Sequence, residues 1–220
     1  MAFNHTILYM PVDIPKFHMK QELIADFHKE FTPHTAQAFE SQRLLKTTKN
    51  YATSEPRDDL TESQIAVIDY VNKYLPFSDL INVKLHHMRR QGSIHIDMVE
   101  PEANPELYQH NKENEPCGYR MVIQGSRHGD LAIITDDQVI KMPVLPEDTD
   151  WYNISHTGTP HGNTRYVDDR YILFCHGRMD IEKQKALVKQ SYNKYKDVPG
   201  AIVHRQEHTY TDDWKSEDAS

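Results

Sequence analysis

The chain has 220 residues, of which 38% are hydrophobic, and this length and apolar content predict a single domain spanning residues 1–220. Its net charge of −8 disfavours nucleic acid as the main partner, because the protein would repel a phosphate backbone. No apolar run reaches the roughly 18–20 residues of a membrane span, and the first residues lack a signal-peptide pattern. Two cysteines are too few for a disulfide framework, so we expect a cytosolic protein without a membrane partner.

The first part of the chain, residues 1–79, is predicted to be largely helical. The segments KQELIADFHKEF and TESQIAVIDYVNKYL place apolar residues three and four positions apart, as amphipathic helices do. Thr61 and Gln64 form a capping box at the start of the second segment, and Pro76 ends it. These helices are expected to flank a β core.

From Leu80 onward the pattern changes to short apolar runs separated by turn-forming residues. LINVKLHH alternates apolar and polar residues, and YRMVIQG, LAIIT, QVIKMPVL, DWYNIS and RYILFCHG continue in the same manner. Strands at this spacing without intervening helices predict an antiparallel sandwich or double-stranded barrel over residues 80–180. The pattern DIEKQKALVKQSYNKYK then predicts a closing helix, so that residues 181–220 hold a C-terminal helix and a polar tail.

The segment SIHID places His95 and Asp97 two residues apart, and residues two apart in a strand project from the same face. An imidazole and a carboxylate on one face can occupy neighbouring positions around a metal ion. A second imidazole from another strand, for which His161 is the candidate, would complete the two-histidine, one-carboxylate triad of non-haem Fe(II) oxygenases. The fourteen histidines of the chain also favour metal chemistry.

Arg170 opens the run RYILF, nine residues after His161. In a strand beside that of His161, its guanidinium would point deep into the barrel, where a buried arginine requires a carboxylate or an equally good partner. An iron site with an adjacent arginine suits a dicarboxylic co-substrate, because one end can chelate the metal while the arginine holds the other.

The series NVKLHHMRRQGSIHID, YRMVIQG, DWYNIS…PHGN and DRYILF resembles a known family, the Fe(II)- and 2-oxoglutarate-dependent oxygenases. Within that family it is most similar to the aspartyl/asparaginyl β-hydroxylase and proline hydroxylase group. The resemblance covers residues 80–180. It implies a mainly β fold whose core is a double-stranded β-helix (jelly-roll, cupin-like) with flanking helices.

The resemblance also implies an activity and the residues that serve it. His95, Asp97 and His161 would bind Fe(II), Arg170 would hold the distal carboxylate of 2-oxoglutarate, and Arg120 would help to bind ligand carboxylates. The expected reaction is hydroxylation by O2 of an unactivated C–H bond, coupled to decarboxylation of 2-oxoglutarate to succinate and CO2. The substrate would be an amino acid, a peptidyl side chain or a small metabolite.

The distal metal ligand has two candidates, because the stretch before Arg170 holds both His156 and His161. PHGN matches the family motif and nine residues is close to the family spacing, whereas His156 lies fourteen residues from the arginine, so His161 is the prediction. Some members of the nearest branch lack the carboxylate ligand, but the two-residue offset of Asp97 from His95 favours direct ligation. Because the carboxylate is kept, we expect hydroxylation rather than halogenation.

Three further residues, Trp151, Tyr152 and Asn163, are candidates for contacting the substrate. Each also has a purely structural interpretation, as strand-packing aromatics and as a turn residue. The acidic segment 99–115 follows the His-Asp pair, forms the longest break in the strand pattern and is a candidate lid over the site.

Other interpretations of the same residues stay open. Taken alone, His95 and Asp97 could be polar residues on an exposed strand edge, and Arg170 could form an ion pair with Asp168 or Asp169 at a turn. A non-catalytic, cupin-like binding module would keep the barrel without the redox chemistry, although it would have little reason to keep the full ligand set. A cupin-type metal-dependent isomerase or dioxygenase usually gathers more histidines into one motif. HRQEH, residues 204–208, fits the H-x-x-E-H pattern of inverted zinc proteases, but few residues follow it to supply a third ligand.

Overall fold

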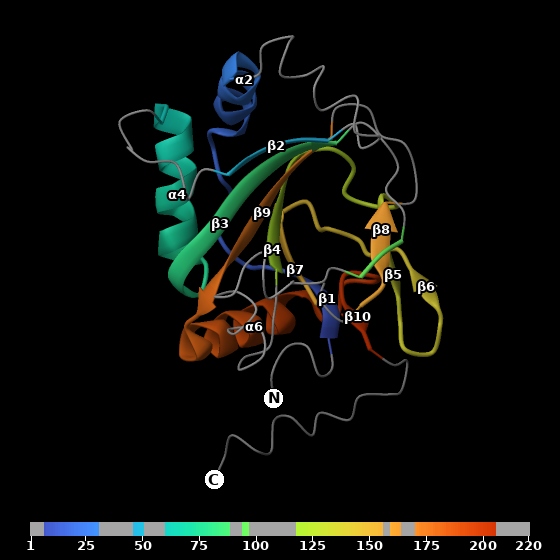
Figure 1. The fold of residues 1–220 in the computed structure, drawn as a ribbon. Coiled ribbons are helices and arrows are strands. Elements are labelled where there is room, and N and C mark those ends of the chain that lie inside the picture. Colours follow the sequence, from blue (N-terminus) through green and yellow to red (C-terminus); the bar gives the residue numbers. More distant parts are fainter. Residues whose placement is uncertain are drawn as a thin grey trace, which may run out of the picture.

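The structure is a computed structural model that describes residues 7–30, 46–50, 60–88, 94–96, 118–155, 159–163 and 170–205. In these ranges the protein is mainly β, with three helices and two antiparallel sheets (Figure 1). The helices are α2 (Lys20–Glu30), α4 (Glu62–Tyr74) and α6 (Ile181–Tyr195). None of these helices is long and apolar enough to cross a membrane.

The larger sheet has seven strands in the order β10-β1-β7-β4-β9-β3-β2. In chain order these strands are β1 (Ile7–Pro11), β2 (Lys46–Asn50), β3 (Phe77–Met88), β4 (Gly118–Gln124), β7 (Trp151–Ile154), β9 (Arg170–Met179) and β10 (Val203–His204). Strand β9 lies between β3 and β4, and both neighbours are antiparallel to it.

The smaller sheet has three strands in the order β6-β5-β8, namely β6 (Ile140–Lys141), β5 (Leu131–Ile134) and β8 (His161–Asn163). A single antiparallel bridge between His95 and His161 brings residues 94–96 to the open edge of β8. Between β3 and β9 the chain therefore crosses repeatedly from one sheet to the other. After β3 in the larger sheet, residue 95 lies beside β8 of the smaller sheet, β4 belongs to the larger sheet, and β5 and β6 belong to the smaller one. β7 then lies in the larger sheet, β8 in the smaller and β9 in the larger. The space between the sheets is consequently lined by strands that are distant in the sequence.

The larger sheet separates two hydrophobic cores, because its side chains alternate between its faces. Figure 1 shows α2 and α4 on one side of this sheet, at the left of the view, and the smaller sheet on the other side. The core on the helix side includes Leu23, Phe27, Val67, Val71, Tyr119, Met121, Trp151 and Leu173. The core between the sheets includes Val122, Leu131, Ile133, Tyr152, Ile154 and Ile172.

The local sequence signals explain the helix ends. The predicted capping box is confirmed: the Thr61 side chain accepts from the Gln64 backbone N–H, and the Thr61 N–H donates to the Gln64 side chain over 3.0 Å. The helix α4 ends at Tyr74, before Pro76. The predicted closing helix is also present as α6, with Asp180 as its N-cap.

The first part of the chain departs from the prediction in one respect, because it supplies strands as well as helices. β1 and β2 both belong to the larger sheet. All five residues of β1 are buried, so its sequence ILYMP is a continuous apolar run without the alternation that identifies a half-exposed strand.

Candidate functional site

Four predicted site residues meet in the space between the two sheets. His161 and Asn163 lie two residues apart on β8, opposite Ile133 and Leu131 of β5. Those two residues belong to the core between the sheets, here called the inner core, so His161 and Asn163 also project toward the larger sheet. Arg120 shares a face of β4 with Val122 and Arg170 shares a face of β9 with Ile172, and both of those neighbours belong to the inner core. All four side chains are buried: the exposed fraction is 2% for His161, 4% for Arg120, 6% for Arg170 and 9% for Asn163.

Two hydrogen bonds among the described residues indicate the tautomer of His161. Its Nδ1 lies 2.9 Å from the backbone carbonyl oxygen of Thr159, which can only accept, so Nδ1 carries the proton. Its Nε2 lies 3.3 Å from Nη2 of Arg120, which can only donate. The Nε2 lone pair therefore points into the space between the sheets, and a histidine held in this way has the tautomer and orientation of a metal ligand.

His95 stands directly beside His161. The backbone N–H of each residue donates to the carbonyl oxygen of the other, over 2.9 and 2.8 Å. Residues paired in this way project from the same face, and the two imidazole centroids lie 4.8 Å apart with an angle of 44° between the ring planes. The pair thus has two imidazoles close enough for neighbouring positions around one ion, and His95 is exposed to solvent.

The third predicted ligand, Asp97, lies outside the described residues, as do the alternative ligand His156, the residues Asp168 and Asp169, and the candidate lid 99–115. Within the described ranges, no three His, Cys, Asp or Glu side chains form a group that could hold a metal ion. The structure therefore brings together two of the three predicted ligands, and ligation by Asp97 stays a prediction.

Arg170 is buried without an acidic partner among the residues that the structure describes. Its Nη1 donates to Oδ1 of Asn163 over 2.5 Å, and its Nε has no hydrogen-bond partner among the described residues. Gly125 passes close to the stem of this side chain: its φ is 137°, and a Cβ added there would lie 3.2 Å from Cγ of Arg170. Within the described ranges no carboxylate balances this buried guanidinium, an arrangement that favours an anionic ligand.

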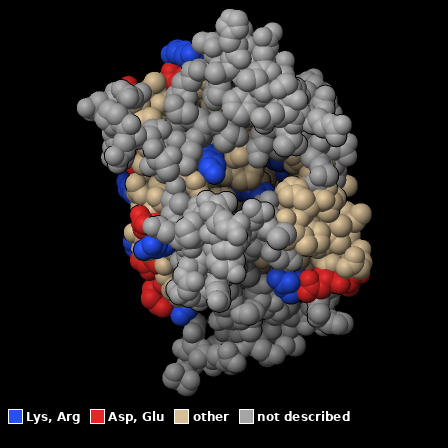
Figure 2. All heavy atoms as spheres, viewed as in Figure 1, with Lys and Arg blue, Asp and Glu red and all other residues tan. Residues whose placement is uncertain are grey.

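Arg120 reaches the same space from β4. Its Cζ lies 4.4 Å from the ring centroid of Phe174, a cation–π contact, and its Nη2 donates to His161. Lys84 and Phe174 are opposite each other in the β3–β9 pairing, so the side chain of Lys84 projects from this inner face as well. Figure 2 shows Lys and Arg atoms in a hollow near the centre of this side of the molecule.

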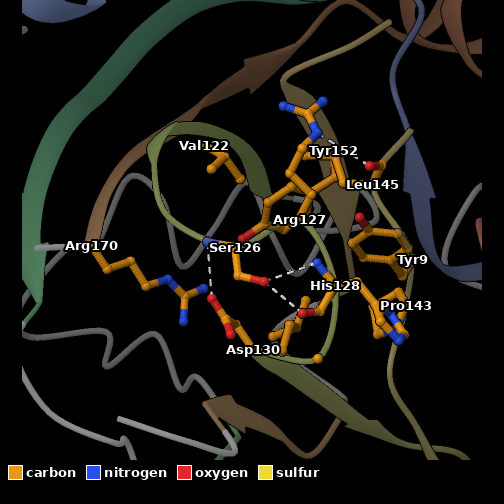
Figure 3. A pocket seen from close by; sticks show the side chains of 12 residues that line it. Tyr9, Val122, Ser126, Arg127, His128, Asp130, Pro143, Leu145, Tyr152 and Arg170 are labelled. Atoms are coloured by element: carbon orange, nitrogen blue, oxygen red, sulfur yellow. Dashed lines mark hydrogen bonds between the residues drawn. The ribbon is translucent and has the colours of Figure 1, made fainter. Parts of the chain in front are cut away.

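A shallow hollow that opens to solvent adjoins Arg170. Figure 3 shows the Arg170 side chain reaching into it, toward Ser126 and Asp130. Asp130 accepts from the backbone N–H of Ser126 over 3.2 Å. The remaining lining is largely apolar or aromatic and includes Tyr9, Val122, Leu131, Leu145 and Tyr152. Burial raises the pKa of Tyr9 well above its ordinary value, so this phenol is neutral.

The two aromatic candidates for substrate contact lie on opposite faces of β7. The Trp151 indole belongs to the helix-side core and stacks on Tyr70, with centroids 5.8 Å apart and planes at 7°. The structure thus separates Trp151 from the other predicted site residues, because it is fully buried behind the sheet. Tyr152 lies in the inner core, 5.1 Å from the ring of Tyr9, and lines the hollow beside Arg170.

Sequence reasoning assigns no role to His86. It is 7% exposed, and its ring lies 4.3 Å from that of Phe174, on the inner face near Arg120. The signal that identifies it is the alternation in NVKLHH, which puts Asn82, Lys84 and His86 on one face of β3.

Comparison with known proteins assigns no family: no model of a protein family matches the chain, and no curated protein matches it. The functional interpretation therefore depends on the residues and their arrangement.

Proposed function

We propose that the protein is an Fe(II)- and 2-oxoglutarate-dependent dioxygenase that hydroxylates an unactivated C–H bond. The observation that carries the proposal is the buried guanidinium of Arg170, whose one partner among the described residues is the neutral amide of Asn163. A buried charge that no protein carboxylate balances is costly unless a ligand supplies the counter-charge. The His95–His161 pair beside the same space adds the second requirement, a place for a metal ion.

The path of the chain supports the finer fold that this function implies. From β4 to β9 successive strands alternate between the two sheets, apart from the consecutive pair β5 and β6, and the bridge of residue 95 to β8 lies between β3 and β4, which both belong to the larger sheet. This order agrees with a double-stranded β-helix, in which inward side chains of both sheets line one ligand space. The pairing of residue 95 with residue 161 agrees with it too, since it makes the two histidine strands neighbours.

The two described histidines are of a kind and at a separation that suit a ferrous ion. His95 and His161 would supply two nitrogen ligands and Asp97 the carboxylate, the set that suits non-haem Fe(II) with open positions. When bound, the iron and 2-oxoglutarate supply the oxidising chemistry, in which O2 is consumed, 2-oxoglutarate is converted to succinate and CO2, and the substrate gains a hydroxyl group. Arg120 and a metal ion compete for the same Nε2 lone pair, so metal binding would release this guanidinium to bind a carboxylate.

The chemistry of the residues next to Arg170 suits a dicarboxylic co-substrate. The guanidinium is a planar donor that can bind one carboxylate bidentately. Val122, Leu131 and Tyr152 line the adjoining hollow and are apolar or aromatic, which suits the methylene carbons of 2-oxoglutarate. In the described part of the inner face, Lys84 and Arg120 add positive charge, so a substrate with an acidic group is compatible with it.

An anaerobic titration tests the proposal. Addition of 2-oxoglutarate to the Fe(II) protein should give a visible charge-transfer band, and admission of O2 with a screen of amino acids and peptides should identify compounds that stimulate succinate release. Arg170→Ala should weaken 2-oxoglutarate binding by about 30-fold or more, since removing one partner of a buried charge pair costs about 2–5 kcal/mol. Iron affinity should change far less.

Arg178→Ala is the matched control, because Arg178 lies on the same strand at an exposed position. It should leave both affinities unchanged. Absence of the band in the intact protein would contradict the proposal. Metal and 2-oxoglutarate binding without succinate release for any compound in the screen would instead favour a non-catalytic binding module.

A further inference from the structure

We infer that Asn163 is a positioning residue, whose neutral amide orients the guanidinium of Arg170 while leaving its charge available to a bound carboxylate. The inference rests on the proposed function, which supplies the carboxylate. It differs from the sequence interpretations of Asn163 as a turn residue or a substrate contact, because its side chain meets the arginine in the interior.

The geometry ties the arginine to the strand that carries the predicted distal metal ligand. Asn163 and His161 lie two residues apart on β8, paired with Leu131 and Ile133 of β5. The hydrogen bond from Arg170 Nη1 to Asn163 Oδ1 therefore connects β9 to β8 across the space between the sheets. Gly125 restricts the stem of the same side chain, because its backbone lies so near that a Cβ on it would approach Cγ of Arg170 to 3.2 Å.

The choice of an amide at this position has a chemical consequence. An aspartate has nearly the same shape and would form a stronger, charge-assisted pair with Arg170, so stability alone would favour it. An aspartate would also satisfy the guanidinium internally and compete with any carboxylate ligand. The amide of Asn163 accepts one hydrogen bond from Arg170 and cancels no charge.

The decisive variant is Asn163→Asp in the full chain. In anaerobic titrations with Fe(II), followed by the charge-transfer band, its dissociation constant for 2-oxoglutarate should rise by about tenfold or more, while its iron affinity stays close to that of the wild type. In turnover, KM for 2-oxoglutarate should rise by a similar factor, and kcat at saturating 2-oxoglutarate should change by less than about threefold.

Thermal melting without ligands provides the second measurement, and it does not depend on the proposed activity. Asn163→Asp should melt at or above the wild-type temperature, with a rise of up to about 2–4 °C, because the new carboxylate meets a buried cation. Asn153→Asp is the matched control. Asn153 is fully buried on the helix side of β7, and its side-chain amide has no hydrogen-bond partner in the described structure, so this variant should melt several degrees lower.

The outcomes separate the inference from the proposed function. If the wild type binds 2-oxoglutarate and Asn163→Asp binds it equally well, the positioning role is wrong and the proposed function stands. If Asn163→Asp melts as low as Asn153→Asp, its side chain does not meet Arg170, which also overturns the inference. If the wild type itself binds no 2-oxoglutarate, the proposed function fails, and the role of Asn163 toward a carboxylate ligand fails with it.

Discussion

Replacing Arg127 with methionine is expected to lower the free energy of unfolding by about 3 kcal/mol, because it removes one of the two cationic partners of the buried carboxylate of Asp150. The side chain of Asp150 is 3% exposed and contacts two cations, Nη1 of Arg127 at 3.0 Å and Nζ of Lys20 at 2.6 Å. The Arg127 guanidinium also donates to the backbone carbonyls of Leu145, Pro146 and Thr149. It therefore holds the segment before β7, on the wall of the hollow beside Arg170.

The expected magnitude follows from what remains after the substitution. Removal of one partner from a buried ion pair costs about 3–5 kcal/mol, and the lower end applies because Lys20 still contacts Asp150. The surroundings are poorly solvated, since burial lowers the pKa of Lys20 despite the carboxylate beside it. For a domain of this size, such a loss corresponds to a fall of about 6–12 °C in Tm.

Urea denaturation followed by circular dichroism measures the loss, with Arg205→Met as the control. Arg205 pairs with Asp136 over 3.2 Å, but these side chains are 29% and 41% exposed, so its removal should cost less than about 1 kcal/mol. The double variant Arg127→Met with Asp150→Asn should recover part of the lost stability, because it also removes the negative charge of the buried Asp150 carboxylate. A loss below about 1 kcal/mol for Arg127→Met, or simple additivity in the double variant, would refute this reasoning.

Three further predictions concern the rest of the structure. Trp151→Ala should destabilise the protein by about 3–5 kcal/mol in urea without changing KM for 2-oxoglutarate, and a raised KM in the folded variant would argue against its place in the helix-side core. The hydrogen bond from Lys29 lowers the pKa of Asp26 to about 2, so the Asp26 carboxylate stabilises the fold above pH 4 and loses this contribution as the pH falls from 4 toward 2. Thermal melting across this pH range should show that Asp26→Asn removes this part of the pH dependence, which amounts to about 1 kcal/mol or less. Gly177→Ala should cost about 1–3 kcal/mol by urea denaturation, because its Cβ would overlap the backbone oxygen of Asp79, and an unchanged midpoint would contradict this packing.

The sequence is sufficient to predict the main elements and the order of the site residues. The three- and four-residue spacing in α2 and α4 identifies the helices, and the period of two identifies β3. The juxtaposition of His95, His161 and Arg170 is predicted from their order along the chain and from the family resemblance, and the two histidines do lie side by side.

Other features depend on tertiary contacts that a single sequence does not encode. The larger sheet is covered on both faces, so Met121 and Val122 are both buried and the alternation that reveals an inner face is lost. For the same reason, the period of two places Trp151 and Tyr152 on opposite faces without saying which one meets the helices. The contact between Asn163 and Arg170 depends on where a long, flexible side chain ends, and this is set by the packing of β8 against β9.

The position of β9 between β3 and β4 constrains how a newly made chain acquires its shape. Val83 on β3 pairs with Cys175, so the two strands can join only after residue 175 has left the ribosome. Until then β3 and β4 lack their shared neighbour and expose unpaired edges, and closing so long a loop slows folding. A fragment that stops short of residue 170 would therefore lack the Arg170 guanidinium and the strand that joins β3 to β4, and we expect it to aggregate.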